Sequence, residues 1–163
     1  MFVMWQYMKA TGLASQYVVD ASQLHALLGV LHQRAVADGY PHAVVLSPGN
    51  GAHAAAHGLE NGPGPSVPLT GPQPQLTMVI GADHTPLLWN DNVPAARQIS
   101  VGPRAVSQPE PQDFFRYFSG GREQYAPESS LVGRDYAWLA AQMFVTSGGH
   151  RPATITWRTR VLL

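Results

Sequence analysis

The stretch FSGGREQYAPESSLVGRDYAWLAAQMFVTSGGHRPATITW, residues 118–157, decides the fold of this chain. Gly120 and Gly121 separate two runs of aromatic and polar residues, and a glycine pair readily adopts the positive φ angles of a tight hairpin turn. A helix follows, because apolar residues then recur at three- and four-residue steps: Tyr136, Leu139, Ala140, Met143 and Phe144. A second glycine pair ends this helix, and Pro152 prevents its continuation. The stretch therefore predicts a hairpin, an amphipathic helix and a final strand.

The N-terminal part of the chain predicts a strand pair and another helix. Residues 2–9 alternate apolar and polar side chains, as a half-buried strand does, and residues 17–19 can return beside them. Asp20 or Ser22 then caps a helix that ends at Gly39. The apolar stripe of this helix consists of Leu24, Leu27, Leu28, Leu31 and Ala35.

Short strands and turns fill most of the middle of the chain. Residues 42–47, HAVVLS, form a β-branched run typical of a buried strand. Residues 76–80 and 86–89 flank a turn at 81–84 and predict a hairpin, and the segment ARQISVG supplies a further strand. All these elements together predict an α+β fold, in which two helices pack on one side of a mostly antiparallel sheet built from hairpins.

The length of 163 residues favours a single domain that spans the whole chain, residues 1–163, around one core. Residues 48–74, PGNGAHAAAHGLENGPGPSVPLTGPQP, differ from the rest because glycine, proline and alanine dominate them. They hold too few large apolar groups to offset the entropy lost on ordering. We therefore expect a flexible insertion in this region.

Composition excludes several classes of function. Ten basic residues balance ten acidic ones, so no net charge steers the chain toward nucleic acid or anionic lipid. The absence of cysteine excludes disulfides and thiolate sites. No apolar run approaches the roughly 18 residues of a membrane-spanning helix, and the N-terminal segment lacks the basic region of a signal peptide. We expect a soluble, cytoplasmic protein.

Two histidines raise the question of a metal site. His53 and His57 have the i, i+4 spacing that places two imidazoles on one helix face. Zinc needs three or four converging ligands, and the flanking glycines and prolines leave room for only a short helix. We therefore predict solvated histidines, no metal site and no cofactor.

An enzyme is the rival class of function. Ser119, His84 and Asp113 offer the residue types of a nucleophile, a base and an orienting acid, as in a small hydrolase. Chain order does not show that they meet, and the sequence contains no G-x-S-x-G elbow, H-E-x-x-H motif or phosphate-binding loop. We expect a protein without catalytic residues.

The C-terminal half of the chain resembles the first Imm family of immunity proteins, which are antidotes in bacterial polymorphic toxin systems. In that family a glycine-containing aromatic strand, a proline-glutamate step, a helix, a glycine, an arginine-proline pair and a tryptophan follow one another. The matching positions here are Gly120, Gly121, Pro127, Glu128, the helix 134–146, Gly148 or Gly149, Arg151, Pro152 and Trp157. The insertion at residues 48–74 and the zero net charge depart from the family pattern.

This resemblance implies a partner and a mechanism. The toxins of the family are frequently nucleic-acid deaminases, so the expected partner is a cognate toxin protein, and neither nucleic acid nor a membrane is bound directly. The expected mechanism is occlusion of the toxin's active site without a covalent step. Since the net charge is zero, recognition should depend on shape and local charge. The alternative is a structural or interaction module without a toxin partner, and the oligomeric state stays open.

The recognisable residues divide into structural ones and candidates for partner contact. Tyr136, Phe144 and Trp157 are predicted core residues, Pro152 stops the helix, and Arg151 is expected to bond the last carbonyls of the helix. The candidates for contact are polar and aromatic residues predicted at hairpin ends or loops, where interfaces recruit tyrosine, tryptophan and arginine. They are Asp83, Trp89, Asp91, Arg116, Tyr117, Arg122, Glu123, Tyr125 and Glu128.

Overall fold

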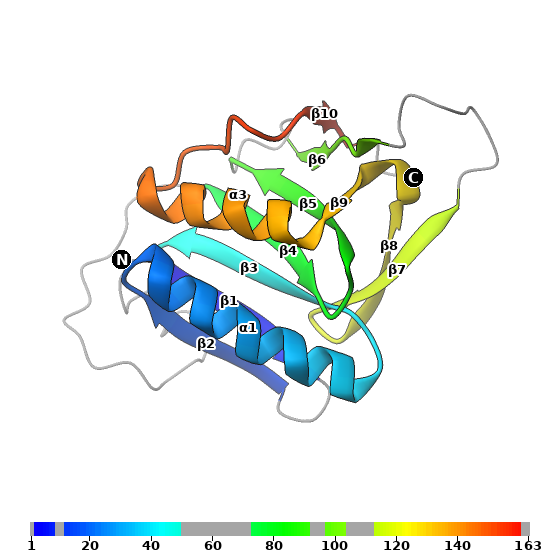
Figure 1. Cartoon of the computed structure of the whole chain (residues 1–163), viewed down its shortest axis with the longest axis horizontal. Coiled ribbons are helices and arrows are strands. Elements are labelled where there is room, and N and C mark those ends of the chain that lie inside the picture. Colours follow the sequence, from blue (N-terminus) through cyan, green and yellow to red (C-terminus); the bar gives the residue numbers. More distant parts are fainter. Residues whose placement is uncertain (1, 9–11, 50–72, 92–96, 104–112, 161–163) are drawn as a thin grey trace.

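The computed structural model describes residues 2–8, 12–49, 73–91, 97–103 and 113–160. Within these ranges, helices α1 (Ala21–Asp38) and α3 (Arg134–Thr146) lie side by side on one face of a curled sheet (Figure 1). The sheet contains ten described strands and is mostly antiparallel. The predicted α+β class, with two helices on one side of a sheet built from hairpins, is therefore confirmed.

The described strands of the main sheet path follow the order β10-β6-β5-β4-β3-β1-β2. They are β1 (Phe2–Met8), β2 (Gly12–Val18), β3 (His42–Pro48), β4 (Gln75–Ile80), β5 (His84–Asn90), β6 (Gln98–Ser100) and β10 (Trp157–Thr159). Every neighbouring pair on this path is antiparallel, and β1–β2 and β4–β5 are the predicted hairpins.

The remaining strands branch from this path. Strand β7 (Phe114–Ser119) and strand β8 (Arg122–Pro127) form the predicted hairpin, and its turn residues Gly120 and Gly121 have φ angles of 57° and 75°. Strand β7 meets β3 in parallel where Phe118 lies opposite His42. A 3-10 turn, η2 (Glu128–Ser130), leads to β9 (Leu131–Gly133), which pairs with β5. The hairpin is thus joined to the sheet at its turn, and the chain returns to the sheet through β9.

Helix α1 begins and ends as the sequence predicts. The Asp20 carboxylate accepts a hydrogen bond from the Gln23 N–H at 2.8 Å, and the Gln23 side chain accepts one from the Val19 N–H at 2.8 Å. Gly39 ends the helix in the left-handed conformation, with φ of 81°. The buried face consists of Leu24, Leu28, Leu31, His32 and Ala35.

Helix α3 has a different buried face from the predicted one. Phe144 is fully buried, but Tyr136 and Leu139 are 45% and 47% exposed, so their predicted burial is wrong. The helix turns a stripe that includes three alanines toward the sheet, which lets its backbone approach closely where a tyrosine would not fit. The buried residues of this stripe are Ala137, Ala140, Ala141, Phe144 and Val145.

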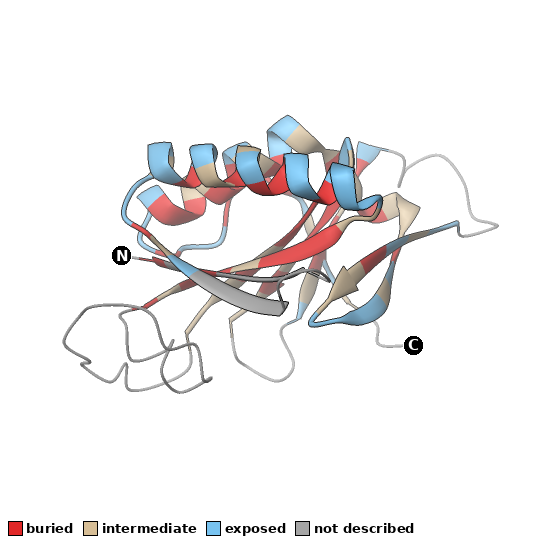
Figure 2. Ribbon diagram, turned by 90° about the horizontal axis from the view of Figure 1, so that it is seen from below, coloured by how far each residue is buried: buried red, intermediate tan, exposed pale blue. Residues whose placement is uncertain are grey.

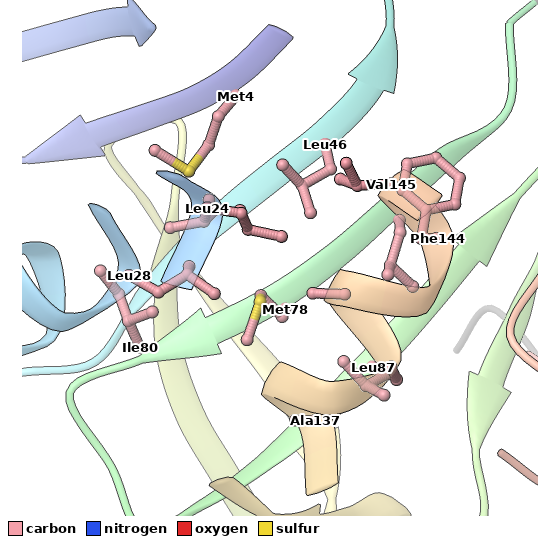
Figure 3. Packing of buried hydrophobic residues seen from close by; sticks show 14 of the residues in the cluster. Met4, Leu24, Leu28, Leu46, Met78, Ile80, Leu87, Ala137, Phe144 and Val145 are labelled. Atoms are coloured by element: carbon pink, nitrogen blue, oxygen red, sulfur yellow. The ribbon is translucent and has the colours of Figure 1, made fainter. Parts of the chain in front are cut away.

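The larger core lies between the helices and the sheet (Figure 3). Met4, Leu46 and Met78 from the strands meet Leu28 of α1 and Phe144 of α3, and all are fully buried. A smaller core lies beneath the β7–β8 hairpin and consists of Ala43, Val79, Ile99, Tyr117 and Ala126, with Leu88 and Phe115 packed against it. Burial extends along the central strands as well as the inner sides of both helices (Figure 2). The central strands therefore carry apolar side chains on both faces.

The C-terminal segment departs from the predicted long strand. Only Trp157–Thr159 form a strand, β10, in the described part of this segment, while residues 153–155 turn. The Arg151 guanidinium donates to the Gln98 side-chain oxygen and not, as predicted, to the last carbonyls of α3. Those carbonyls accept instead from the backbone N–H groups of Ser147, Gly148 and Gly149. Trp157 is half-buried beside the core, and its indole N–H donates to the Pro152 carbonyl at 3.1 Å.

The predicted insertion falls largely outside the described residues, which resume at position 73. Pro48, its expected first residue, is the last residue of β3. Because β3 and β4 are direct antiparallel partners, the chain between them leaves and returns at the same end of the sheet. Neither helix in the described ranges is long and apolar enough to cross a membrane.

The larger core and the exposed side of α3 allow a matched test of leucine burial. Replacing the fully buried Leu28 by alanine removes methyl groups from the larger core and should lower the free energy of unfolding by about 2–5 kcal/mol. The same change at the half-exposed Leu139 should alter the free energy of unfolding by less than about 0.5 kcal/mol. Chemical denaturation followed by circular dichroism measures both, and equal effects would contradict this core.

Candidate interaction surface

The β7–β8 hairpin presents two chemically different faces. Residues opposite each other in the pair point to the same side, and Arg116 lies opposite Tyr125 while Phe118 lies opposite Glu123. Alternate residues point to the other side, where Tyr117 and Ala126 enter the smaller core. We call the side that faces solvent the hairpin outer face, defined by Phe114, Arg116, Glu123 and Tyr125.

The polar groups of the hairpin outer face form one network. Arg116 Nη1 donates to Glu123 Oε1 at 3.1 Å, and the Tyr125 hydroxyl donates to Glu123 Oε2 at 2.8 Å. The hydrogen bond to the carboxylate raises the pKa of the Tyr125 phenol, because the phenolate form loses it. An exposed ion pair of this kind contributes little to stability. The two hydrogen bonds connect the three side chains on one face of the hairpin.

Aromatic surface accompanies this network. Phe114 is 47% exposed and Tyr125 is 51% exposed, so each leaves about half of a large ring in solvent. Tyrosine, phenylalanine and arginine are enriched at protein interfaces, where they supply wide contact area at small entropic cost. The hairpin outer face therefore combines two exposed aromatic rings with a charge of each sign, and these are residue types that protein interfaces favour.

The turn end of the hairpin is fixed to the sheet. The Phe118 N–H donates to the Pro41 carbonyl at 2.9 Å. The Phe118 ring lies 5.0 Å from the Tyr40 ring, and the Tyr40 ring lies 4.7 Å from the imidazole of the buried His42. These aromatic contacts hold the tip of the hairpin against the start of β3.

The other end of the hairpin is held by buried serines. The Ser100 hydroxyl donates to the Ser130 carbonyl at 2.6 Å and accepts from the Leu87 N–H at 2.9 Å, which links the exit of the hairpin to β5 and β6. The Gly102 N–H also donates to the Ser129 carbonyl. A Cβ atom at Gly102 would lie 2.0 Å from the Leu131 carbonyl oxygen, so only glycine permits this approach. With both ends fixed, the outer face is presented on a rigid support.

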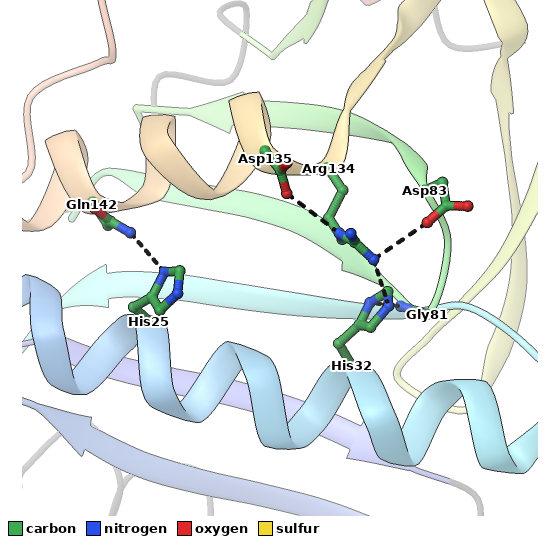
Figure 4. Close-up of polar contacts among 7 residues, drawn as sticks. All are labelled: His25, His32, Gly81, Asp83, Arg134, Asp135 and Gln142. Carbon is green, nitrogen blue, oxygen red and sulfur yellow. Dashed lines mark hydrogen bonds and ion pairs between the residues drawn. The ribbon is translucent and has the colours of Figure 1, made fainter.

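A second polar cluster joins the two helices to the β4–β5 turn (Figure 4). Arg134, the first residue of α3, contacts the Asp83 carboxylate at 3.3 Å and His32 Nε2 at 3.1 Å. His32 Nδ1 in turn lies 3.1 Å from the Gly81 N–H. Farther along the helices, Gln142 contacts His25 at 3.0 Å, and the Trp138 ring packs edge-on against both imidazoles. Arg134 therefore connects three separate elements.

The chemistry of His32 favours the neutral imidazole. A neutral ring has one nitrogen lone pair, so it accepts from Gly81 or from Arg134 but not from both, and proton uptake removes this acceptor. Burial and the adjacent Arg134 charge lower the pKa of His32, and the nearby Asp83 opposes this only in part. The cluster links the two helices to each other and to the β4–β5 turn. Local sequence patterns carry no signal for this cluster, because residues in contact within it are up to 117 residues apart in the chain.

Two of the predicted contact residues lie inside the protein. Trp89 is 6% exposed and packs edge-on against Phe144, with ring centres 5.8 Å apart. Tyr117 is 2% exposed in the smaller core. The predicted surface position of both is wrong, because β5 is covered on both sides and because Tyr117 alternates with Arg116 along β7. The same alternation places Phe114, which is not among the predicted contact residues, beside Arg116 on the outer face.

The other predicted contact residues are dispersed. Only Arg116, Glu123 and Tyr125 gather on the hairpin outer face. Arg122 is exposed beside the turn, on the opposite side of the hairpin, and Asp83 is exposed at the β4–β5 turn. Asp91 follows β5 and Glu128 begins η2, and both are half-buried.

The residues of the hydrolase alternative do not meet. Asp113 precedes β7 and Ser119 ends it, so at about 3.3 Å per residue they lie about 20 Å apart. His84 is exposed at the start of β5, opposite Gly133 of β9. These three groups therefore form no catalytic triad.

The described residues contain no group of three or more histidine, aspartate or glutamate side chains that could hold a metal ion. His53 and His57 lie outside the described residues. Comparison with known proteins gives no further guide, since neither a protein-family model nor a curated protein matches the chain.

The lowered pKa of His32 predicts a pH dependence of stability. The unfolded chain takes up the proton near pH 6.5, while the folded protein resists it until lower pH, so the free energy of unfolding should fall as the pH drops below about 6.5. In His32→Asn, whose side-chain oxygen can still accept from Gly81, this fall should be smaller. Urea denaturation between about pH 7.5 and pH 5 measures the difference. Parallel curves for both proteins would show that His32 does not contribute.

Proposed function

We propose that this protein is an immunity protein that binds a cognate bacterial toxin through the hairpin outer face. The observation that carries the proposal is the preformed network of Arg116, Glu123 and Tyr125 beside the exposed ring of Phe114. The resemblance of the C-terminal half to the first Imm family supports the choice of partner, and a nucleic-acid deaminase is the toxin class it favours. The site of action is the cytoplasm, where such a toxin meets its substrate.

The inhibitory mechanism is occlusion of the active-site mouth of the toxin. A rigid surface loses little conformational entropy on binding, so more of its contact energy appears as affinity. Phe114 and Tyr125 provide the apolar anchors, while Arg116 and Glu123 can exchange their mutual contact for groups of opposite charge on the toxin. No bond is formed or broken in this process. The protein therefore acts without a catalytic residue or a cofactor.

The broader alternative is an interaction module with a partner other than a toxin. The hairpin outer face supports this reading equally well, since its aromatic and charged groups suit a protein partner of any class. A hydrolase that uses His84, Ser119 and Asp113 has no support, because β7 separates the last two.

Truncation of the outer face tests the proposed interface. The double variant Phe114→Ala/Tyr125→Ala removes both exposed rings, and we expect the Kd for the toxin to rise by about 30-fold or more, because aromatic anchors each contribute about 1–2 kcal/mol or more. The candidate toxin to be tested is the product of the adjacent gene, and isothermal titration calorimetry measures the Kd. Co-expression should also rescue bacterial growth with the unaltered protein and fail with the variant.

A matched control removes exposed apolar side chains from the helix layer. Val36 and Leu139 are 54% and 47% exposed on α1 and α3, so Val36→Ala/Leu139→Ala removes two similarly exposed apolar side chains elsewhere. This control should leave the Kd unchanged. Loss of binding in the control alone would move the interface to the helices, and failure of the unaltered protein to bind or to protect would refute the toxin as partner.

The balanced charge of the chain predicts a weak effect of salt on association. Ten basic and ten acidic residues, and the neutral pair of Arg116 and Glu123, provide no long-range attraction. The association rate constant should therefore change by less than about threefold between about 0.05 and about 0.5 M NaCl, whereas steered complexes change by about tenfold or more. Stopped-flow fluorescence measures this rate. A steep decrease with salt would show that long-range electrostatic attraction steers association.

A further inference from the structure

A cleft of about 170 Å³ opens beside the smaller core. On one side lie the inner residues of the β7–β8 hairpin, including Tyr117 and Gln124, and on the other lie the ends of β5 and β6 with Asn90 and Gln98. The cleft is on the opposite side of the hairpin from the hairpin outer face, because Tyr117 and Gln124 alternate with its residues. It is therefore a separate site from the proposed toxin interface.

The charge of the cleft has one sign. Arg97 and Arg160 line it, and the Arg160 N–H donates to the Arg97 carbonyl at 2.9 Å, so these two cationic residues lie next to each other on one wall. No aspartate or glutamate is found among the described residues that line it. Asp91 follows Asn90 in the chain but does not belong to the lining. Two like charges without a carboxylate in the lining favour an anion between them.

The neutral residues of the cleft add hydrogen-bond donors. Arg160 donates to the Tyr117 hydroxyl oxygen, and since arginine can only donate, the phenolic O–H remains a donor. Burial raises the pKa of Tyr117, although Arg160 opposes the shift, so this proton is retained at neutral pH. The side-chain oxygen of Gln98 accepts from Arg151, so its NH₂ group is the end left to donate. The oxygens of Tyr117 and Gln98 are thus engaged as acceptors, and each of these two side chains keeps a donor group.

The size of the cleft limits the ligand. Pockets for drug-sized molecules enclose about 300–1,000 Å³, and this cleft is smaller than that range. It still exceeds the space of a single water molecule, which occupies about 30 Å³ in the liquid. A single carboxylate or phosphate group fits these limits, whereas a whole nucleotide does not.

We propose that this cleft binds one oxyanion, a carboxylate or phosphate group, held by Arg97 and Arg160 with side-chain donors from the strands and the hairpin. Guanidinium groups match the planar or tetrahedral oxygen arrangement of these anions through paired hydrogen bonds. The site does not depend on the toxin, and its existence and the proposed immunity function can fail separately.

Nuclear magnetic resonance of the ¹⁵N-labelled full chain tests the site. Sodium phosphate and sodium acetate are titrated separately, with ionic strength held constant by NaCl, and the side-chain NH₂ signals of Asn90, Gln98 and Gln124 report on the cleft. At least one anion should give saturable shifts at these signals. Arg97→Met and Arg160→Met should each weaken the apparent Kd by about tenfold or more, because hydrogen bonds to a charged group are lost.

The control is Arg34→Met, which removes the same charge from an exposed position on α1. It should leave the Kd unchanged. Saturation with phosphate alone identifies a phosphate ligand, and saturation with acetate alone identifies a carboxylate. Absence of saturation with both anions, or equal weakening by Arg34→Met, would overturn the proposal. If Arg160→Met loses its folded spectrum because the contact with Tyr117 is lost, the exposed Arg97 decides the outcome.

Discussion

Burial of the central strands on both faces is the constraint from which the rest of this structure follows. β3 and β4 carry one set of apolar side chains toward the helices and another toward the opposite side. The helices cover the first set, so something else must cover the second, and the β7–β8 hairpin does so with Tyr117 and Ala126. A hairpin used as a cover has a second side that faces solvent. Because side chains alternate along a strand, burial of the inner residues of β7 and β8 leaves the aromatic and charged residues of the outer face exposed to solvent.

The supports of the hairpin bear on how the protein would act on a partner. Buried hydrogen bonds through Ser100 and Ser130 hold one end, and aromatic contacts around Phe118 hold the other. Opening the hairpin would expose the smaller core and leave these polar groups unpaired, and both changes cost free energy. With both ends held, the hairpin keeps its position on the sheet, and the proposed occlusion of a toxin requires this.

The sequence was a good guide to which elements form and a poor one to which way they face. Glycine pairs, caps and periodicity predicted both helices and the hairpins, because these signals act between residues close in the chain. In α3, however, both the stripe with Tyr136 and the stripe with Ala137 are apolar, and packing against the sheet selects between them. The predicted surface position of Trp89 is wrong because a strand covered on both faces lacks the alternation of apolar and polar residues that marks an exposed side. At the candidate site, Arg116 and Tyr117 are consecutive residues of one strand, so their side chains point to opposite faces. Strand geometry alone therefore excludes one of them from the outer face.

The pairing of β3 with β4 also makes one place in the chain tolerant of change. Whatever joins two antiparallel neighbours starts and finishes about 5 Å apart, so its length does not affect the register of the sheet, and doubling the length of a flexible connection costs only about 0.6 kcal/mol. This junction follows Pro48, whereas the hairpin meets β3 at His42, about 20 Å away along the strand. Evolution can therefore lengthen or shorten the β3–β4 junction, and a fluorophore or affinity tag can be grafted there, while the opposite end of β3 continues to hold the hairpin.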